Sequence, residues 1–245
     1  MMQVLLIQLR EDAATRDHEF DCFVKQAGID PSVVVRINAL EHDVTPNDLH
    51  GVHVIVVGGS GEFLISRGDI AETIDAVGET LRAARKQGIP MLGMCFGAQI
   101  MAHVFGGTVA LDAEKQEIGT FMVTKNVCAA DCPIFSLMPE TFPAQLGHKD
   151  FVTVLPPGAV NLASSDLSTV QAFTFPGEPI YATTFHPELD ENSLLWRIDQ
   201  YAMQYDLSQQ DVATMKQALY PTPDSVKVLH HFFEEVVKNG KRFRA

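Results

Sequence analysis

In the first half of the chain, short apolar runs of strand length alternate with longer segments whose apolar residues recur at helical spacing. The runs cover residues 4–8, 33–37, 54–57 and 90–93, and the helical segments cover residues 16–27, 69–87 and 98–105. Strands that alternate with helices lie parallel in one sheet, joined by right-handed crossovers. Such strands are buried on both faces, which explains why these runs are continuously apolar. The pattern predicts an α/β fold with an open, mostly parallel, twisted sheet flanked by helices.

The rest of the chain has a different pattern. Strand-like segments without long helices between them cover residues 116–124, 143–147, 158–165, 169–175 and 180–185, so we expect antiparallel additions to a flavodoxin-like sheet. From residue 191 onward the pattern is helical. We therefore expect a main domain over residues 1–190 and a C-terminal helical extension of the same domain over residues 191–245, because no linker separates them. A lid or a partner-docking surface is another interpretation of this extension.

Two capping signals predict where helices of the extension begin. Ser208 is followed three residues later by Asp211, which is an N-cap arrangement. Asp224 or Ser225 is in position to cap a later helix, whose apolar stripe includes Phe232.

Charge and composition limit the classes of partner. Hydrophobic residues make up 46% of the 245 positions, enough for a full core, and the formal net charge is −13. Nucleic acids and anionic membranes attract clustered Lys and Arg, so this charge argues against both. The N-terminal apolar run has no basic residues before it, is followed by Arg10, Glu11 and Asp12, and is too short for a signal peptide or a membrane span. We therefore expect a cytoplasmic protein.

The four cysteines do not form a pattern typical of a disulfide scaffold, and without a secretion signal we expect reduced thiols. Cys128 and Cys132 are four positions apart, but no second pair or histidine cluster completes a metal site. The sequence therefore predicts neither a metal nor a cofactor.

The pentapeptide Gly93-Met94-Cys95-Phe96-Gly97 stands where a predicted strand ends and a predicted helix begins. A nucleophile at such a junction occupies a sharp, strained turn, and glycines on both sides let the strand and helix backbones approach closely. The turn exposes the Cys95 sulfur at the carboxyl end of the sheet, near a helix N-terminus that favours the thiolate. It also aims the Phe96 N–H at an oxyanion formed on an attacked carbonyl group. A buried, unreactive cysteine is the alternative interpretation.

His186-Pro187-Glu188 follows Cys95 by ninety-one positions, at the end of another apolar run. Residues two apart in an extended chain point to the same side, and Pro187 favours an extended chain. The Glu188 carboxylate can therefore orient the His186 imidazole while the imidazole faces the sulfur. His148, with Asp150 as its nearest carboxylate, is the competing candidate for the base.

Together, three motifs resemble those of class I (triad) glutamine amidotransferases, especially free-standing members similar to the glutaminase domain of GMP synthase. They are Gly93-x-Cys95-x-Gly97-x-Gln99, an upstream Gly58-Gly59 loop, and His186-Pro187-Glu188. The resemblance covers about residues 50–190, with the motifs in the family's order. It implies that Cys95 is the nucleophile, His186 the general base and acid, and Glu188 the orienting carboxylate.

The resemblance also implies an oxyanion hole and a glutamine pocket. Backbone N–H groups of Gly59 and Phe96 would form the hole. Gln99 lies one helical turn beyond the cysteine and matches the family position that holds the amino-acid end of glutamine. Segments 116–119 and 147–150 resemble pocket-lining loops. The implied substrate-binding residues are Gly58, Gly59, Gln99, Glu117 and His148. Ser60 departs from the family pattern because many members have proline there, which leaves the geometry of the hole open.

The reaction implied by the resemblance has two halves. The Cys95 thiolate attacks the side-chain amide of glutamine, and His186 protonates the departing ammonia to leave a γ-glutamyl thioester. Water activated by the same imidazole then releases glutamate. The chain has neither a Ser-Gly-Gly-x-Asp-Ser-like pyrophosphatase loop nor a GxxxxGK[ST] phosphate loop. Any synthetase step that uses the ammonia is therefore expected on a separate polypeptide, or not at all.

Three other functions remain open at this point. A γ-glutamyl peptidase or hydrolase would use the same triad on a γ-glutamyl amide larger than glutamine. A regulatory or binding module could retain the fold without catalysis, although intact Cys95, His186 and Glu188 argue against it. A member of the heat-shock protease-like family would share the cysteine turn, but the His-Pro-Glu motif disfavours this interpretation.

Overall fold

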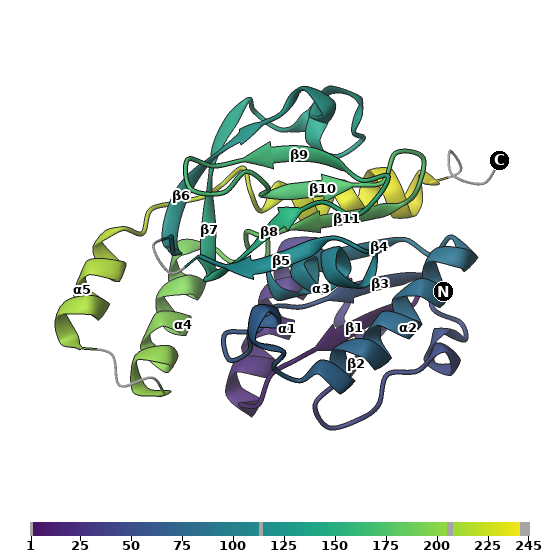
Figure 1. The fold of residues 1–245 in the computed structure, drawn as a ribbon, viewed down its shortest axis with the longest axis horizontal. Coiled ribbons are helices and arrows are strands. Elements are labelled where there is room, and N and C mark those ends of the chain that lie inside the picture. Colours follow the sequence, from purple (N-terminus) through teal and green to yellow (C-terminus); the bar gives the residue numbers. More distant parts are fainter. Residues whose placement is uncertain (1, 113–114, 205–207, 241–245) are drawn as a thin grey trace.

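The computed structural model describes residues 2–112, 115–204 and 208–240, and its centre is a sheet with helices on both faces (Figure 1). Within these residues the sheet has nine strands. Their order across the sheet is β2 (Val34–Asn38), β1 (Val4–Gln8), β3 (Val54–Val57), β4 (Met91–Met94), β11 (Ile180–Thr183), β10 (Ala172–Thr174), β9 (Val160–Ser164), β6 (Glu117–Lys125) and β7 (Thr141–His148). A second sheet pairs β5 (Thr108–Leu111) with β8 (Asp150–Val154).

The large sheet is parallel in one half and antiparallel in the other. Strands β2, β1, β3, β4 and β11 run parallel. This order is typical of flavodoxin-like folds, whose ligand sites lie at the carboxyl ends of the strands. Strands β10, β9, β6 and β7 are added antiparallel. The predicted fold class is therefore confirmed. The sequence does not predict β5 and β8, because these short strands mix buried residues with exposed ones such as Thr108 and Val154.

Six α-helices are present in the described part of the chain. They are α1 (Ala13–Ala27), α2 (Ala71–Gln87), α3 (Phe96–Val104), α4 (Glu191–Gln204), α5 (Gln209–Gln217) and α6 (Lys227–His231), which continues as the π-helix η6 (Phe232–Lys238). Short 3₁₀ helices cover Pro31–Val33, Pro46–Leu49, Ile65–Arg67, Val127–Asp131 and Phe135–Leu137. None of the helices in residues 2–112, 115–204 and 208–240 is long and apolar enough to cross a membrane.

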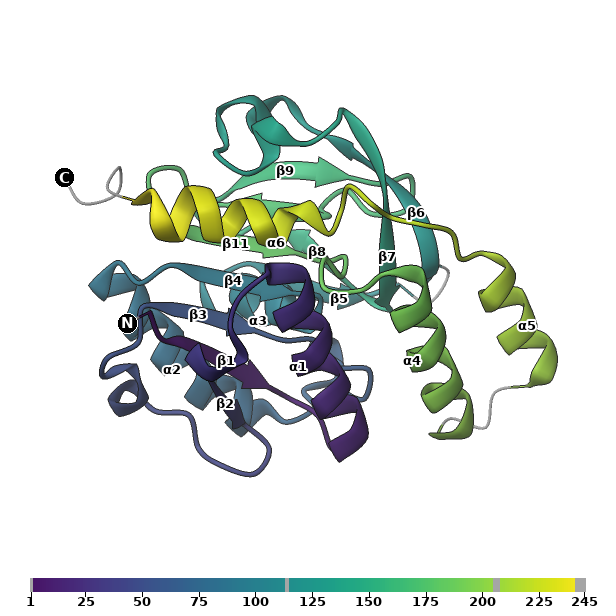
Figure 2. The same ribbon diagram turned by 180° about the vertical axis from the view of Figure 1, so that it is seen from behind.

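Two layers of helices bury the two faces of the parallel half. Helices α1, α6 and η6 cover one face (Figure 2), where the rings of Phe23 and Phe233 lie 6.1 Å apart in the core. Helices α2 and α3 cover the other face through residues such as Ile74 and Met101. Buried faces on both sides are what continuously apolar parallel strands require.

The segment predicted as a helical extension has two parts in different places. Helices α4 and α5 lie at the end of the molecule where the parallel strands finish, whereas α6 and η6 pack back onto the sheet beside α1 (Figures 1 and 2). Residues 205–207 and 241–245 of the predicted extension lie outside the described residues.

One of the two predicted helix caps is confirmed. The Ser208 side chain accepts the Asp211 N–H at 3.1 Å and caps α5. The cap predicted at Asp224 or Ser225 is wrong, because α6 begins at Lys227 after Val226 and has no side-chain cap. The Asp224 carboxylate instead binds the Lys227 ammonium at 2.7 Å, and the Ser225 hydroxyl donates to the Thr222 carbonyl. These side chains are therefore engaged in the turn before the helix.

The turn between β4 and α3 has the strained geometry expected of a nucleophile position. Cys95 has φ 51° and ψ −107°, a conformation that residues other than glycine rarely adopt. A Cβ at Gly93 would lie 2.7 Å from the Gly97 carbonyl oxygen, and a Cβ at Gly97 would collide with the Val57 carbonyl oxygen. Both positions need glycine because α3 packs directly on β3 and β4.

We expect Gly97→Ala to lower the free energy of unfolding by about 3 kcal/mol, because the added methyl group must push α3 away from the Val57 carbonyl. The matched control is Gly158→Ala, where a Cβ meets open space and only the positive φ of 84° is unfavourable, at about 1 kcal/mol. Urea denaturation measures both. Equal stability of the two variants would contradict the close packing described here.

Candidate active site

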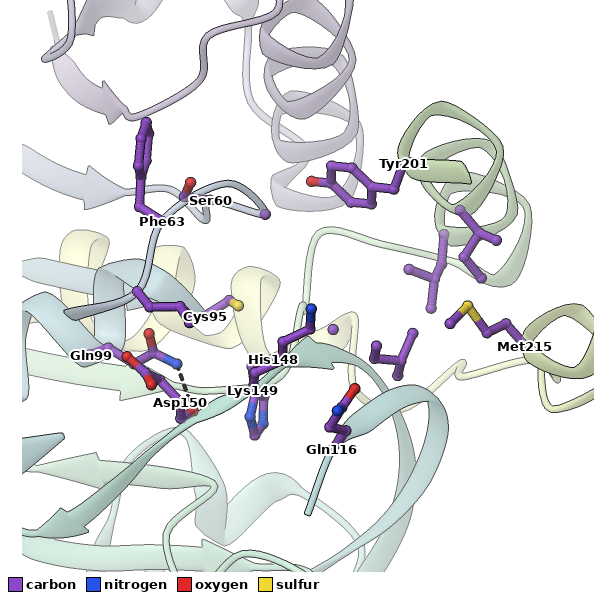
Figure 3. A pocket seen from close by; sticks show the side chains of 16 residues that line it. Ser60, Phe63, Cys95, Gln99, Gln116, His148, Lys149, Asp150, Tyr201 and Met215 are labelled. Atoms are coloured by element: carbon purple, nitrogen blue, oxygen red, sulfur yellow. Dashed lines mark hydrogen bonds between the residues drawn. The ribbon is translucent and has the colours of Figure 1, made fainter. Parts of the chain in front are cut away.

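A pocket of about 180 Å³ opens beside Cys95 at the carboxyl end of β4 (Figure 3). Gln99 and His148, two of the predicted substrate-binding residues, line it. Segment 147–150 contributes all four of its residues, whereas segment 116–119 contributes Gln116 and Ile118. Gly58, Gly59 and Glu117 do not line this pocket.

Cys95 and His186 come together because their strands are neighbours. Strands β4 and β11 pair in parallel with Met94 opposite Thr183, so the residues that follow them meet at the same end of the sheet. The Cys95 N–H donates to the Thr183 carbonyl at 2.8 Å. A Cβ at Gly59 would lie 3.1 Å from His186 Cε1 and 3.6 Å from Cys95 Cβ, so both side chains converge on the same glycine. The Cys95 side chain is close enough for its charge to raise the pKa of His186.

His186 and Glu188 form a buried pair. His186 Nδ1 lies 2.7 Å from Glu188 Oε1, and 5% or less of either residue is exposed. Burial lowers the pKa of His186, but the charges of Glu188 and Cys95 outweigh it and raise that pKa to about 9. Burial raises the pKa of Glu188, but the His186 imidazolium outweighs it and lowers that pKa to about 2. At neutral pH the pair is therefore a carboxylate and an imidazolium, with the imidazolium beside the sulfur.

The sequence analysis missed Arg197, which extends this charge arrangement. Its Nη1 lies 3.7 Å from Glu188 Oε1, and its charge also lowers the pKa of Glu188. Arg197 is 1% exposed, and its Nε donates to His18 Nδ1 at 3.5 Å. His18 in turn stacks on Trp196 with ring centres 4.1 Å apart. The sequence does contain a signal for a buried arginine. Arg197 lies three positions after Leu194, on the apolar side of a helical pattern where a charged residue is unexpected.

His148 is poorly suited to act as the base. Burial and the nearby His186 charge lower the pKa of His148 to about 4, so it is neutral at physiological pH. Its candidate partner Asp150 accepts hydrogen bonds from the Ser66 N–H and hydroxyl at 2.9 and 2.6 Å. Glu117 lies behind His148, fully buried and bound by Gln171 and Ser165 at 2.7 and 2.6 Å. These contacts indicate that Glu117 lies behind the pocket and supports His148, whereas His148 faces the pocket.

The Gly58-Gly59 loop is attached to a second buried ion pair that the sequence analysis did not identify. The Gly59 N–H donates to Glu19 Oε1 at 3.0 Å. That oxygen also lies 2.8 Å from Arg10 Nη2, and Arg10 Nη1 donates to the Tyr201 hydroxyl at 2.8 Å. A Cβ at Gly58 would lie 2.6 Å from the Glu19 carboxylate, so this glycine makes room for the pair. In this structure the Gly59 N–H is therefore engaged by Glu19.

Phe96, the other predicted donor of the oxyanion hole, and Ser60, which departs from the family pattern, have different surroundings. Phe96 is the first residue of α3, so its N–H has no acceptor within the helix. Ser60 donates its hydroxyl to Glu62 Oε2 at 2.8 Å and accepts the Glu62 N–H at 3.2 Å. These bonds hold the turn where many family members have the rigid ring of proline, which accounts physically for the departure at this position.

No group of three or more His, Cys, Asp or Glu side chains within the described ranges is arranged to hold a metal ion. Cys128 is exposed and Cys132 is buried, and neither forms a disulfide.

Comparisons with known proteins identify the family of this chain. The profile of the family described as glutamine amidotransferase class-I matches residues 24–193. A relative from Methanocaldococcus jannaschii, named as a glutamine-hydrolysing subunit of GMP synthase, is 29% identical over 75% of this chain and 88% of its own length. The protein of the same name from Thermoplasma acidophilum is 30% identical over 68% of this chain and 76% of its own length.

Solved structures show the same fold. The crystal structure of a glutamine amidotransferase from Thermotoga maritima superposes with a TM-score of 0.72 over 97% of this chain and 98% of its own, at 17% identity. The family profile spans 170 of the 245 residues and includes Cys95, His186 and Glu188. This chain therefore belongs to the class I glutamine amidotransferase family of enzymes.

Proposed function

We propose that this chain hydrolyses a γ-glutamyl amide, of which glutamine is the simplest, through a thioester on Cys95. The observation that carries the proposal is the buried His186–Glu188 pair, whose imidazolium faces a cysteine in a strained turn at the pocket. A strained cysteine alone is compatible with an inert thiol. A charged imidazole beside it, oriented by a carboxylate, supplies what amide cleavage requires.

The first half of the reaction forms the thioester. The Cys95 sulfur attacks the side-chain carbonyl carbon, and the C–N bond of the resulting tetrahedral intermediate breaks. Nitrogen is a poor leaving group unless it is protonated, and the raised pKa of His186 supplies an imidazolium that gives up this proton. Glu188 keeps the ring oriented and stabilises its charge. Arg197 in turn keeps Glu188 ionised.

The second half releases glutamate. The imidazole, now neutral, takes a proton from water as that water attacks the thioester carbonyl. The C–S bond breaks, the electron pair returns to the Cys95 sulfur, and His186 is again protonated for the next substrate. Gln99 and His148 line the pocket around the sulfur, and we assign them contacts with the substrate.

The oxyanion of each intermediate needs N–H donors. Phe96 offers one without rearrangement, because its N–H starts a helix. Gly59 lies against both His186 and Cys95, but its N–H must leave Glu19 before it can serve as the second donor. Loss of one such donor raises the barrier by about 3 kcal/mol. Rotation of this peptide group is therefore a step of the proposed cycle.

Glutamine and a synthetase partner are supported by the relatives' names. The proteins from Methanocaldococcus jannaschii and Thermoplasma acidophilum are each named as the glutamine-hydrolysing subunit of a GMP synthase. By analogy, with glutamine as the substrate, the ammonia would pass to an acceptor enzyme on another chain. A γ-glutamyl hydrolase is the second candidate, because apolar residues of α4 and α5 line one end of the pocket.

Cys95→Ser and Cys95→Ala should each lower kcat for glutamine and for γ-glutamyl peptides by at least about 10³-fold, because no thioester can form. Stability should change little in Cys95→Ser, since the side chains are nearly isosteric. Glutamate release measures the first effect and urea denaturation the second. The matched control is Cys128→Ser, whose side chain is exposed. Wild-type turnover by Cys95→Ala would remove the proposal.

Glu188→Gln should move the alkaline limb of the pH profile of kcat/KM to lower pH. In the wild type this limb is expected near the pKa of about 9 of His186, because activity is lost as the imidazolium loses its proton. The carboxylate is the main group that raises this pKa, so removing its charge lowers it. Profiles of both proteins with one substrate give the comparison. An unchanged alkaline limb would show that the limb belongs to another group.

Arg197→Met should move the acidic limb of the same profile to higher pH. The Arg197 charge helps to lower the pKa of Glu188, so the carboxylate takes up a proton at higher pH once that charge is gone. Arg197→Lys keeps the charge and should restore part of the wild-type profile. A purely structural Arg197 would reduce kcat/KM equally at all pH values, and such a result would contradict its assignment as a positioning residue.

A further inference from the structure

The pocket extends to both sides of the Cys95 sulfur, with Gln99 and Phe63 on one side and Met215, Tyr201 and Gln116 on the other (Figure 3). At one end the Gln99 side chain donates to the backbone carbonyl of Asp150 at 2.9 Å. At the other end lie three apolar side chains from the C-terminal helices, which we call the amine wall: Leu194 and Ile198 of α4 and Met215 of α5. A substrate bound across the sulfur must therefore place one half against each end.

The position of His186 decides which half faces the amine wall. Its imidazole must face the departing nitrogen in order to protonate it. His186 is tied through Glu188 to Arg197, which lies on α4 between Leu194 and Ile198. On the opposite side, a Cβ at Gly147 would lie 3.8 Å from His186 Nε2, and Gly147 lines the pocket. Glu188 holds His186 Nδ1, so Nε2 is the nitrogen that can protonate the amine. Gly147, beside Nε2, pairs with Ile118 of β6, and α5 packs against that strand. The departing amine therefore faces the end of the pocket where the amine wall lies.

We infer that the amine released by this enzyme is apolar, so that its substrate class is γ-glutamyl amides of hydrophobic amines or amino acids; this inference rests on the proposed function. Ammonia would make no apolar contact with the amine wall. A hydrophobic substituent on the nitrogen would instead remove from water both its own apolar surface and that of the amine wall. The bonds formed and broken are the same as in the proposed cycle. The Cys95–carbon bond forms, the C–N bond breaks, and the amine leaves with the proton from His186.

The charges around the pocket agree with this assignment. Besides Cys95 and Tyr201, the described lining residues with ionisable side chains are His148, Lys149 and Asp150, and burial lowers the pKa of His148 to about 4. Asp150 is bound by Ser66. The three side chains of the amine wall are uncharged, so none of them could bind a charged amine. Met215 is half-buried, so part of its side chain remains available to a ligand.

The amine wall also lies outside the segment shared with the family profile. That segment ends at residue 193, before Leu194, Ile198 and Met215. The catalytic residues and the Gln99 end of the pocket lie within it. The family's chemistry of amide cleavage and the choice of amine are therefore assigned to different parts of the chain.

The first test compares substrates on the wild-type enzyme. Glutamine, γ-glutamyl-leucine, γ-glutamyl-aspartate and γ-glutamyl-lysine share the acyl half and differ only in the amine, and glutamate release is measured for each. We expect kcat/KM for γ-glutamyl-leucine to exceed the other three by tenfold or more, since even one methylene group in an apolar pocket changes kcat/KM by about tenfold. Turnover with glutamine equal or preferred would overturn the inference but leave the proposed function standing. Release from none of the four would overturn both.

The second test changes the amine wall. Met215→Glu should lower kcat/KM for γ-glutamyl-leucine at least tenfold and raise the ratio of γ-glutamyl-lysine to γ-glutamyl-leucine, because a carboxylate now faces the amine. Met215→Leu should keep the wild-type order of substrates. The matched charge control is Val127→Glu, at a side chain that is 89% exposed and remote from the pocket, which should leave all rates unchanged. An unchanged substrate order in Met215→Glu would overturn the inference.

Discussion

The strained backbone at Cys95 is the constraint on which the rest of the site depends. A residue other than glycine at φ 51° costs of order 1–3 kcal/mol, so the surrounding packing must hold it there. Gly93 and Gly97 make that packing possible, because they let α3 lie directly against β4 and β3. The same turn places the sulfur beside His186, because β4 and β11 are parallel neighbours. Both the packing of α3 on the sheet and the position of the sulfur beside His186 therefore depend on the turn between β4 and α3.

Around this junction, α4 contacts both halves of the catalytic centre. Arg197 approaches Glu188 on the triad side, and Tyr201 accepts a hydrogen bond from Arg10 on the side of the Gly59 loop. The side chains between them form part of the pocket. One helix thus contacts the carboxylate partner of His186, the proposed general acid, and the ion pair that holds the Gly59 loop, and it also contributes to the amine wall. Displacement of α4 would affect all three together.

Much of this arrangement could be predicted from the sequence, and the exceptions have a common cause. The parallel strands and the Cys95 turn follow from local patterns of apolar residues and glycines. Arg10 and Glu19 could not be found in this way, because no local pattern indicates that these buried charges meet each other, Tyr201 and the Gly59 loop. The hydrogen bond from Gly59 to Glu19 spans forty positions, and no motif at either end indicates it.

The proposed catalysis requires a γ-glutamyl thioester on the sulfur that faces His186. Mass spectrometry of the Cys95 peptide after acid quenching during the first turnover measures this intermediate directly. We predict an added γ-glutamyl group on Cys95 that disappears as glutamate is released. Steady glutamate release with this peptide unmodified, or with the group on another cysteine, would contradict a thioester at Cys95.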